Sequence, residues 1–331
     1  MLNINLQHAP RLALKLAAVA ASLLMTSPAV NAADAAATWP TKPVTLMVPY
    51  AGGGGTDILA RLVGSKLAEI WGQSVIVENK AGANGVIGSA EIARSAPDGY
   101  KVMLVVGSHV INPILTKSVP FDSLKDFTPI TLLAASPMVL VVQKDGKFPD
   151  LETFIKKGKE APISVGYSEG ATQLTGELIR QKAGIKVVPV PYKGGSPLMI
   201  DIVGGHVDSG VTSVLTALPH VKSGKLDVIG TTADKRLEMY PNGETFKQAG
   251  YPEVEALSWY GLFGPKGMPD EVVRKFRESM IQATQDPTIA KKLAEQGATI
   301  YLNSQADFIK FLEGEKIKWA NVAKAGNIQQ E

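Results

Sequence analysis

The stretch Val48-Pro49-Tyr50-Ala51-Gly52-Gly53-Gly54-Gly55-Thr56-Asp57-Ile58-Leu59-Ala60-Arg61 decides how the rest of the chain is interpreted. An apolar run ends here, four glycines follow, and apolar residues then recur at helical spacing over residues 56–70, which predicts a strand, a turn and a helix. Glycine suits a backbone that turns sharply or approaches another group closely. The first N–H groups of a helix lack partners within it, and the helix dipole favours negative charge there. The sequence therefore predicts an anion site, for a carboxylate or a phosphate.

The spacing of these glycines argues against a nucleotide. A dinucleotide-binding pattern that began at Gly53 would need glycine or alanine where Ile58 stands, and no Gly-Lys-Ser/Thr follows for a phosphate loop. A tight turn without a ligand is the simpler alternative. Four successive glycines nevertheless lose much backbone entropy on folding, and a turn rarely needs so many unless something approaches the backbone.

The N-terminus of this 331-residue chain is typical of an export signal. Arg11 and Lys15 precede an apolar core at residues 16–25, and Val30-Asn31-Ala32 is a small-residue cleavage pattern. Residues 1–32 are predicted to be a signal peptide that is cleaved after Ala32. The apolar core is shorter than the ~20 residues that span a bilayer. We expect a soluble exported protein, without disulfides because the chain has no cysteine.

Charge and composition exclude several classes of partner. Beyond the signal, 32 basic residues balance 31 acidic ones, whereas a surface that binds nucleic acid normally carries a clustered basic excess. No nucleic-acid partner is expected. The histidines show neither an i, i+4 pair nor His-Glu-x-x-His spacing, so no metal site and no cofactor are predicted.

Strand and helix patterns alternate along the mature chain. Strands are predicted at 44–48, 75–78 and 101–106 with helices between them, an order that implies a parallel sheet whose ligand lies beyond the carboxyl ends of the strands. The same alternation over residues 151–231 predicts a second α/β unit. Between the two units, Ser136-Pro137 separates two apolar runs and is a plausible place for the chain to cross from one domain to the other.

An enzyme is the alternative to a binding protein. Gly166-Tyr167-Ser168-Glu169-Gly170 matches the nucleophile elbow G-x-S-x-G between a predicted strand and a predicted helix. In an α/β-hydrolase the histidine follows the serine, and here only His206 and His220 do so. We place His206 in a turn and His220 on a surface helix. A secreted serine ester hydrolase is therefore the second hypothesis, because motifs this short recur by chance.

Segments along nearly the whole mature chain match one family in its order. Besides residues 48–61, they are Trp39-Pro40-Thr41-Lys42-Pro43-Val44, Val77-Glu78-Asn79-Lys80-Ala81-Gly82-Ala83-Asn84-Gly85, Ala96-Pro97-Asp98-Gly99-Tyr100, Phe121-Asp122-Ser123-Leu124-Lys125-Asp126-Phe127-Thr128-Pro129-Ile130, Val190-Pro191-Tyr192-Lys193-Gly194-Gly195 and Gly205-His206-Val207-Asp208. The chain thereby resembles the TctC-like or Bug receptors, the periplasmic solute-binding proteins of tripartite tricarboxylate transporters.

The resemblance implies an α/β protein with a two-domain, type II-like periplasmic-binding-protein fold, with parallel or mixed sheets, crossover strands and an interdomain ligand cleft. Residues 39–137 and 259–331 would form domain 1, and residues 138–258 domain 2. The function implied is a periplasmic, non-enzymatic and monomeric receptor. It would capture a small organic carboxylate, a di- or tricarboxylate with the aromatic dicarboxylates included, by domain closure, and deliver it to the permease subunits in the membrane.

The resemblance also implies that ligand-binding residues lie on two βα loops, residues 50–57 and 167–173. Further candidates lie beyond the third strand and on the second domain. The predicted ligand-binding set is Tyr50, Gly53, Gly54, Gly55, Thr56, Asp57, Ser108, His109, Asn112, Ser168, Gly170, Ala171, Thr172, Gln173, Tyr192, Lys193 and Ser213. Three of these residues have an alternative interpretation: Tyr192 as a packing residue, Lys193 as a solvated residue, and His109 as a hydrogen-bonded structural residue.

The chain departs from the family's pattern at two positions that bear on the ligand. Gln173 stands where the second loop usually ends in histidine, and Thr212-Ser213 replaces an acid often found deep in the second domain. Without that acid a cationic ammonium group is disfavoured at the far end of the ligand. A neutral or anionic group is expected there.

Overall fold

The computed structural model describes residues 39–330 except residue 296. The predicted signal peptide and its cleavage site lie outside the described residues. Residues 40–331 form one compact unit. In the part of the chain that the structure describes, no helix is both long and apolar enough to cross a membrane.

The predicted β-α-β-α-β start is confirmed. It consists of β1 (Val44–Val48), α3 (Gly55–Trp71), β2 (Val75–Asn79), the short 3-10 helix η1 (Ala83–Gly85), α4 (Val86–Ala93), β3 (Lys101–Val105) and α5 (Ser108–Leu115). Strand β1 pairs in parallel with both β2 and β3. The apolar side chains that predicted the first helix divide as expected, since Leu59, Val63 and Leu67 are buried on its inner face while Ile58 is exposed.

The second predicted α/β alternation is also present. It comprises α6 (Leu151–Glu160), β5 (Ile163–Tyr167), α7 (Gly170–Ala183), β6 (Val187–Pro191), α8 (Gly195–Val203), β7 (Ser209–Ser213), α9 (Val214–Lys222), β8 (Leu226–Thr231) and the short strand β9 (Glu244–Thr245). Strand β5 pairs in parallel with β6 and β7, so the sheet repeats the arrangement of β1 with its two neighbours.

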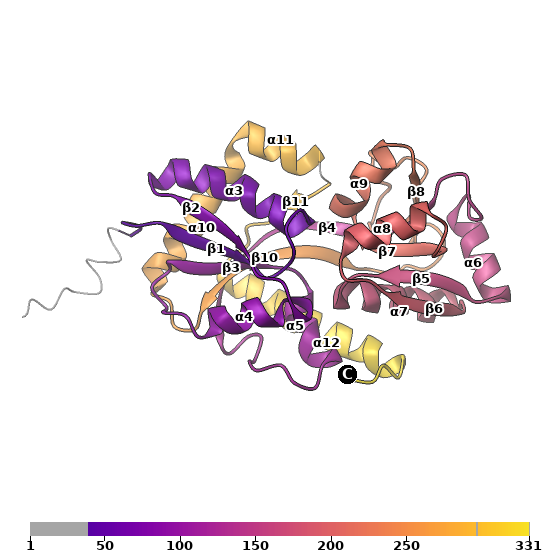
Figure 1. The fold of residues 1–331 in the computed structure, drawn as a ribbon, viewed down its shortest axis with the longest axis horizontal. Helices are drawn as coiled ribbons and strands as arrows, with labels where there is room; N and C mark the ends of the chain where they lie inside the picture. Colours follow the sequence, from indigo (N-terminus) through magenta and orange to yellow (C-terminus); the bar gives the residue numbers. More distant parts are fainter. Residues whose placement is uncertain (1–38, 296, 331) are drawn as a thin grey trace, which may run out of the picture. The chain divides into compact units, whose positions relative to one another are not determined.

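The two apolar runs on either side of Ser136-Pro137 form one strand, β4 (Phe127–Gln143), and not two. It pairs antiparallel with β10 (Leu257–Pro265) up to Pro137, and with β7 from Met138 onward. Proline cannot donate to a strand ladder, and here it stands where β4 changes partners. The sheet order is consequently β2-β1-β3-β10-β4-β7-β5-β6, and Figure 1 shows β4 and β10 joining the two sets of parallel strands.

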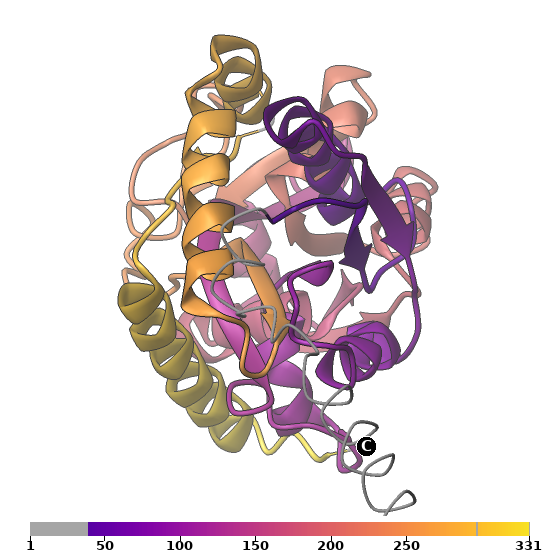
Figure 2. The same cartoon turned by 90° about the vertical axis from the view of Figure 1, so that its left-hand side faces the viewer.

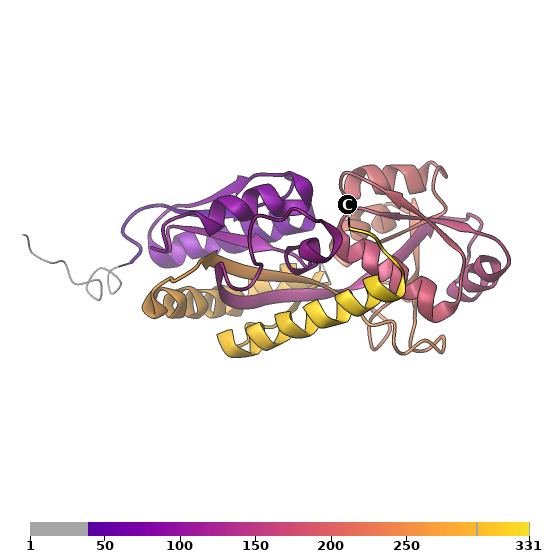
Figure 3. The same ribbon diagram turned by 90° about the horizontal axis from the view of Figure 1, so that it is seen from below.

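The C-terminal section returns to the first strands. It contains α10 (Asp270–Gln285), α11 (Pro287–Glu295), β11 (Thr299–Ile300) and α12 (Gln305–Ala325). The Trp71 indole of α3 donates to Ser279 Oγ of α10 at 2.7 Å and packs edge-on against Phe276. Helices α10 and α12 lie on the same side of the strands (Figures 2 and 3). Trp259 of β10 bonds to Glu315 of α12, so this helix is fixed to a strand that joins the two halves of the sheet.

Candidate functional site

The glycine turn before α3 is held by the buried carboxylate of Asp57. Its Oδ2 accepts from the N–H of Gly53 at 2.9 Å and from Nε of Arg61 at 3.1 Å. Arg61 also donates to Asn79, whose amide donates to the carbonyl of Tyr50. Burial opposes the charge on Asp57, but the hydrogen bonds from Arg61 and Gly53 more than offset it and lower the pKa of Asp57. Asp57 therefore stays ionised and fixes the shape of the turn.

The four glycines of this turn have different surroundings. A Cβ on Gly53 or Gly54 would meet nothing closer than 3.7 Å, and both residues are exposed. A Cβ on Gly55 would lie 2.9 Å from Oη of Tyr260 and 3.3 Å from Cβ of Leu215. Gly55 thus lets the first turn of α3, which includes buried Thr56, approach both β10 and α9.

The second predicted loop, after β5, is held by hydrogen bonds to the side chain of Thr172. Its Oγ1 accepts from the N–H groups of Ser168 and Glu169, each at 3.1 Å, and donates to the carbonyl of Glu169 at 2.9 Å. Helix α7 starts at Gly170, because Glu169 is its N-cap and forms a capping box with Thr172. The half-buried Gln173 donates its N–H to the Glu169 carbonyl and lies within the helix.

The start of α7 packs closely on α5, which follows the third strand. A Cβ on Gly170 would lie 2.8 Å from Cγ2 of Ile111, and a Cβ on Gly107 would lie 3.3 Å from Cβ of Ala171. Two glycines, one on each side of the contact, therefore bring the second loop against the residues beyond β3.

Tyr50 links the first loop to the residues after β3. Its hydroxyl bonds to Oγ of Ser108 at 2.8 Å and accepts from the N–H of Val106 at 3.3 Å, while its ring lies against Gly85. Burial raises the pKa of Tyr50, and the negative charge of Glu169 raises it further. The structure thus brings Tyr50, Ser108 and the second loop into one neighbourhood.

Tyr260 of β10 belongs to the same neighbourhood and was not in the predicted set. It is fully buried, its hydroxyl faces Gly55, and its side chain bonds to Ser258 and to the predicted residue Ser213. Ser213 is the N-cap of α9. Burial first, and then the charge of Glu169, raise the pKa of Tyr260 to about 12. Tyr260 was missed because nothing near it in sequence marks a site: the strand that carries it is apolar.

His109 lies in an aromatic cluster. Its ring centroid is 5.8 Å from that of Phe121 and 4.8 Å from those of Phe127 and Phe263. Nε2 bonds to the carbonyl of Ser123 at 2.9 Å, and Nδ1 has no hydrogen-bond partner among the described residues. Burial lowers the pKa of His109 to about 4, so the imidazole is neutral. These contacts support the structural interpretation of His109.

Of three other candidates, two are hydrogen-bonded to protein groups and one is exposed to solvent. The buried Asn112 donates to the carbonyl of Asn84 at 2.9 Å and so supports the glycine-bearing turn before α4. The Tyr192 hydroxyl donates to Oδ2 of Asp201 at 2.8 Å, and burial together with that carboxylate raises its pKa to about 12. Lys193 is exposed. These surroundings favour the packing interpretation of Tyr192 and the solvated one of Lys193.

The two histidines that a hydrolase would need lie at the amino ends of the parallel strands, whereas Ser168 lies at their carboxyl ends. Ser168 follows the carboxyl end of β5, whereas His206 precedes the amino end of the parallel strand β7. Helix α9 starts at the carboxyl end of β7 and runs back along the sheet, and His220 is in its last turn. The carbonyl of His220 accepts from the N–H of Lys225, in the turn between α9 and β8. A triad through Ser168 and either histidine is not assembled.

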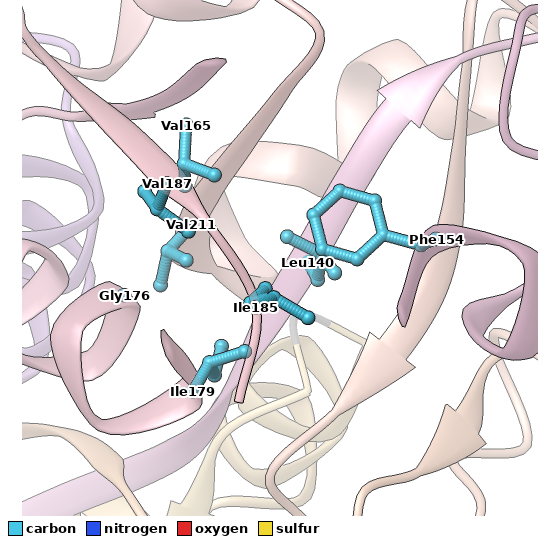
Figure 4. Close-up of a pocket in the computed structure, with 8 residues that line it drawn as sticks. All are labelled: Leu140, Phe154, Val165, Gly176, Ile179, Ile185, Val187 and Val211. Atoms are coloured by element: carbon cyan, nitrogen blue, oxygen red, sulfur yellow. The ribbon is translucent and has the colours of Figure 1, made fainter. Parts of the chain in front are cut away.

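Two small spaces lie away from these loops. The first is an apolar space with no room for a water molecule, shown in Figure 4. It is lined by Leu140, Phe154, Val165, Gly176, Ile179, Ile185, Val187 and Val211. The second has about 40 Å³ and lies beside Gln143, Lys147 and Asp208. Neither is lined by a predicted ligand-binding residue.

Comparison with known proteins gives consistent matches over most of the chain. A family model described as the tripartite tricarboxylate transporter family receptor, TctC, matches residues 59–328. Protein BugT of Bordetella pertussis is 31% identical over 308 residues, which cover 91% of this chain and 94% of BugT. The solved structure of the periplasmic binding protein BugD has a TM-score of 0.82 at 29% identity, over 88% of this chain and all of BugD. The Rpa4515 protein of R. palustris with adipate has a TM-score of 0.84 at 30% identity, over 88% of this chain and all of Rpa4515. The structure therefore has the fold of two-domain periplasmic binding proteins.

Proposed function

Because the chain belongs to the tripartite tricarboxylate transporter receptor family, we propose that it captures a small organic carboxylate outside the cytoplasm and delivers it to a membrane permease. The observation that carries this proposal is the meeting of two strand-to-helix turns. The first turn of α3 approaches Tyr260 of β10, and the start of α7 packs on α5, whose Ser108 bonds to Tyr50 of the first loop. Two helix N-termini directed at one region favour a bound anion.

The proposed ligand is a di- or tricarboxylate, with an aromatic acid as a further possibility within the same class. One similar structure is described with adipate, a dicarboxylate. In our proposal one carboxylate is bound by backbone N–H groups at residues 54–56 and 170–171. The hydroxyls of Ser108, Ser168 and Ser213 supply neutral donors around it. Asp57 contributes by shaping the first turn.

Domain closure is the proposed mechanism of capture. We propose that residues 39–137 with 259–331 form one domain and residues 138–258 the other, with β4 and β10 as the connecting strands. A ligand that touches both loops binds the closed form better than the open form, and only this difference in affinity can shift the balance between them.

The proposal includes export and a transient partner. The predicted signal peptide would direct a monomeric receptor to the periplasm, where it would dock on the permease of its transporter. We also propose that the chain has no catalytic activity. The family is a receptor class, and the positions of His206 and His220 relative to Ser168 support the same conclusion.

Thermal unfolding with a ligand panel tests the proposed function. A carboxylate at a hundredfold excess over its dissociation constant should stabilise the protein by about 2–3 kcal/mol. The panel would hold adipate, malate, citrate, benzoate and phthalate, with adipamide as a control that lacks the charge. No shift in melting temperature with any of the acids would contradict the proposal. Ester hydrolysis that disappears in Ser168→Ala would favour the hydrolase instead.

A further inference from the structure

Glu169 is an acidic side chain at the centre of the proposed anion site, and nothing in the carboxylate-capture mechanism above uses it. It stands between β5 and α7, between the proposed ligand residues Ser168 and Gly170. Its side chain is partly buried, and the packing of Gly170 against Ile111 fixes the loop that carries it. A carboxylate ligand bound to the same loop would lie beside a second carboxyl group.

The groups that face Glu169 come from several elements. The negative charge of Glu169 raises the pKa of Tyr50, in the loop after β1, and that of Tyr260, on β10. Ser108 and Ser213 bond to these two tyrosines and are neutral. The side chain of Ile111 on α5 is apolar. Among the described residues no Lys, Arg or His acts on the pKa of Glu169, whose shift has burial as its cause.

We propose that Glu169 binds a proton when the carboxylate ligand enters, so that the site takes up the ligand together with one proton. This inference rests on the proposed function. Two carboxylates that share a site repel each other unless one of them is protonated. A carboxyl has two oxygens, so its capping-box bond to α7 leaves one oxygen able to carry the proton and donate it to the ligand.

Burial raises the pKa of Glu169 to about 7, which brings proton uptake by this carboxyl into the range of neutral pH. Below pH 7 the carboxyl is largely neutral and offers a donor to the ligand. Above pH 7 each pH unit makes protonation, and with it binding, about tenfold less favourable. A carboxylate with an ordinary pKa near 4 keeps its own charge over this range, so the expected pH dependence belongs to the protein.

The test measures binding of adipate by calorimetry at pH 6.5 and pH 8.5, together with the acid from the ligand panel that gives the largest thermal shift. For the wild type we expect affinity about twentyfold weaker at pH 8.5, given a site pKa of about 7. Titrations at pH 8 in phosphate and in Tris, whose ionisation enthalpies differ, should show uptake of nearly one proton per ligand. In Glu169→Gln the affinity should be the same at both pH values within twofold, with no proton uptake.

Glu152→Gln is the matched control, because Glu152 is an exposed acid in the first turn of α6. It should keep the pH dependence and the proton uptake of the wild type. Equal wild-type affinities at both pH values without proton uptake would overturn the inference and leave the proposed function intact. Failure of every panel acid to bind the wild type at either pH would instead refute the proposed function, and the inference with it.

Discussion

At the scale of single residues, the buried His109 and the partly buried Glu169 act on stability in opposite directions. His109 has a pKa of about 4 in the folded protein and 6.5 as its ordinary value, so between these values the unfolded chain binds more protons and stability rises with pH. Glu169 has a pKa of about 7 against 4.5, so the folded protein binds more protons and stability falls as pH rises from 4.5 to 7. Between pH 4.5 and 6.5 the two effects cancel.

Glu169→Gln should reveal the contribution of His109 to the pH dependence of stability. We expect the free energy of unfolding of this variant to rise by up to about 1.4 kcal/mol per pH unit, and by about 2 kcal/mol in all from pH 4.5 to 6.5, while the wild type changes little. Urea denaturation at three pH values measures both profiles, with Glu152→Gln as the control that should follow the wild type. A flat profile for Glu169→Gln would show that His109 is not held neutral by its aromatic surroundings.

The glycines of the first turn give a second prediction at this scale. Gly55→Ala places a methyl group 2.9 Å from Oη of Tyr260, whereas Gly54→Ala meets only the Ala51 carbonyl at 3.7 Å. Forced overlap in a packed region costs about 1–3 kcal/mol. We expect Gly55→Ala to lower both the melting temperature and carboxylate affinity, and Gly54→Ala to retain the wild-type melting temperature within about a degree. Equal effects of the two substitutions would contradict this close approach.

At the scale of elements, the start of helix α7 is set by its local sequence, whereas the surroundings of its interior glycine are set by packing. The sequence predicted a helix after the Gly166–Gly170 motif, but it did not indicate that Glu169, an unusual N-cap, starts this helix at Gly170. The helix also carries an interior glycine, Gly176, whose Cβ would lie 3.8 Å from Val165 and from Val211. That is ordinary contact distance, and Gly176 borders the apolar space of Figure 4.

Gly176→Ala should therefore stabilise the protein. Replacing glycine by alanine inside a helix gains about 0.5–1 kcal/mol, and here the added methyl also contacts apolar side chains. We expect a melting temperature about 2–4 °C higher, measured by calorimetry without ligand. Gly158→Ala in α6 is the matched opposite, since its Cβ would lie 2.9 Å from Cβ of Ile185, and it should lower the melting temperature. A destabilised Gly176→Ala would mean that the neighbouring side chains leave less room than the backbone geometry indicates.

At the scale of the whole molecule, regular elements were more predictable than the contacts between them. The apolar runs predicted β1 with both ends correct, and β2 and β3 to within one residue. The sequence marked Ser136-Pro137 as a crossing point but did not show that the two apolar runs form one strand, which changes partner there from β10 to β7. Tyr260 and Glu169 were missed because their surroundings arise from segments distant in sequence, and no local pattern reports burial among distant residues.

The bond that joins β10 to α12 yields the last prediction. Oε2 of the buried Glu315 accepts from Nε1 of Trp259 at 3.0 Å and from Nε1 of Trp319 at 2.9 Å. Glu315→Leu leaves two buried indole N–H groups without an acceptor, at a cost of about 1–3 kcal/mol for each unsatisfied group. We expect a loss of about 2–5 kcal/mol in urea denaturation, recorded by circular dichroism and by tryptophan fluorescence.

Glu315→Gln is the matched variant, because its amide oxygen can still accept both bonds, and it should recover most of the stability lost in Glu315→Leu. Since β4 and β10 belong to both halves of the sheet, the two probes should report one transition for the wild type. Equal stability of Glu315→Leu and the wild type would show that the two indoles have other acceptors. In that case α12 would be held to β10 by packing alone, through the ring of Phe308 against Trp259 and Phe263.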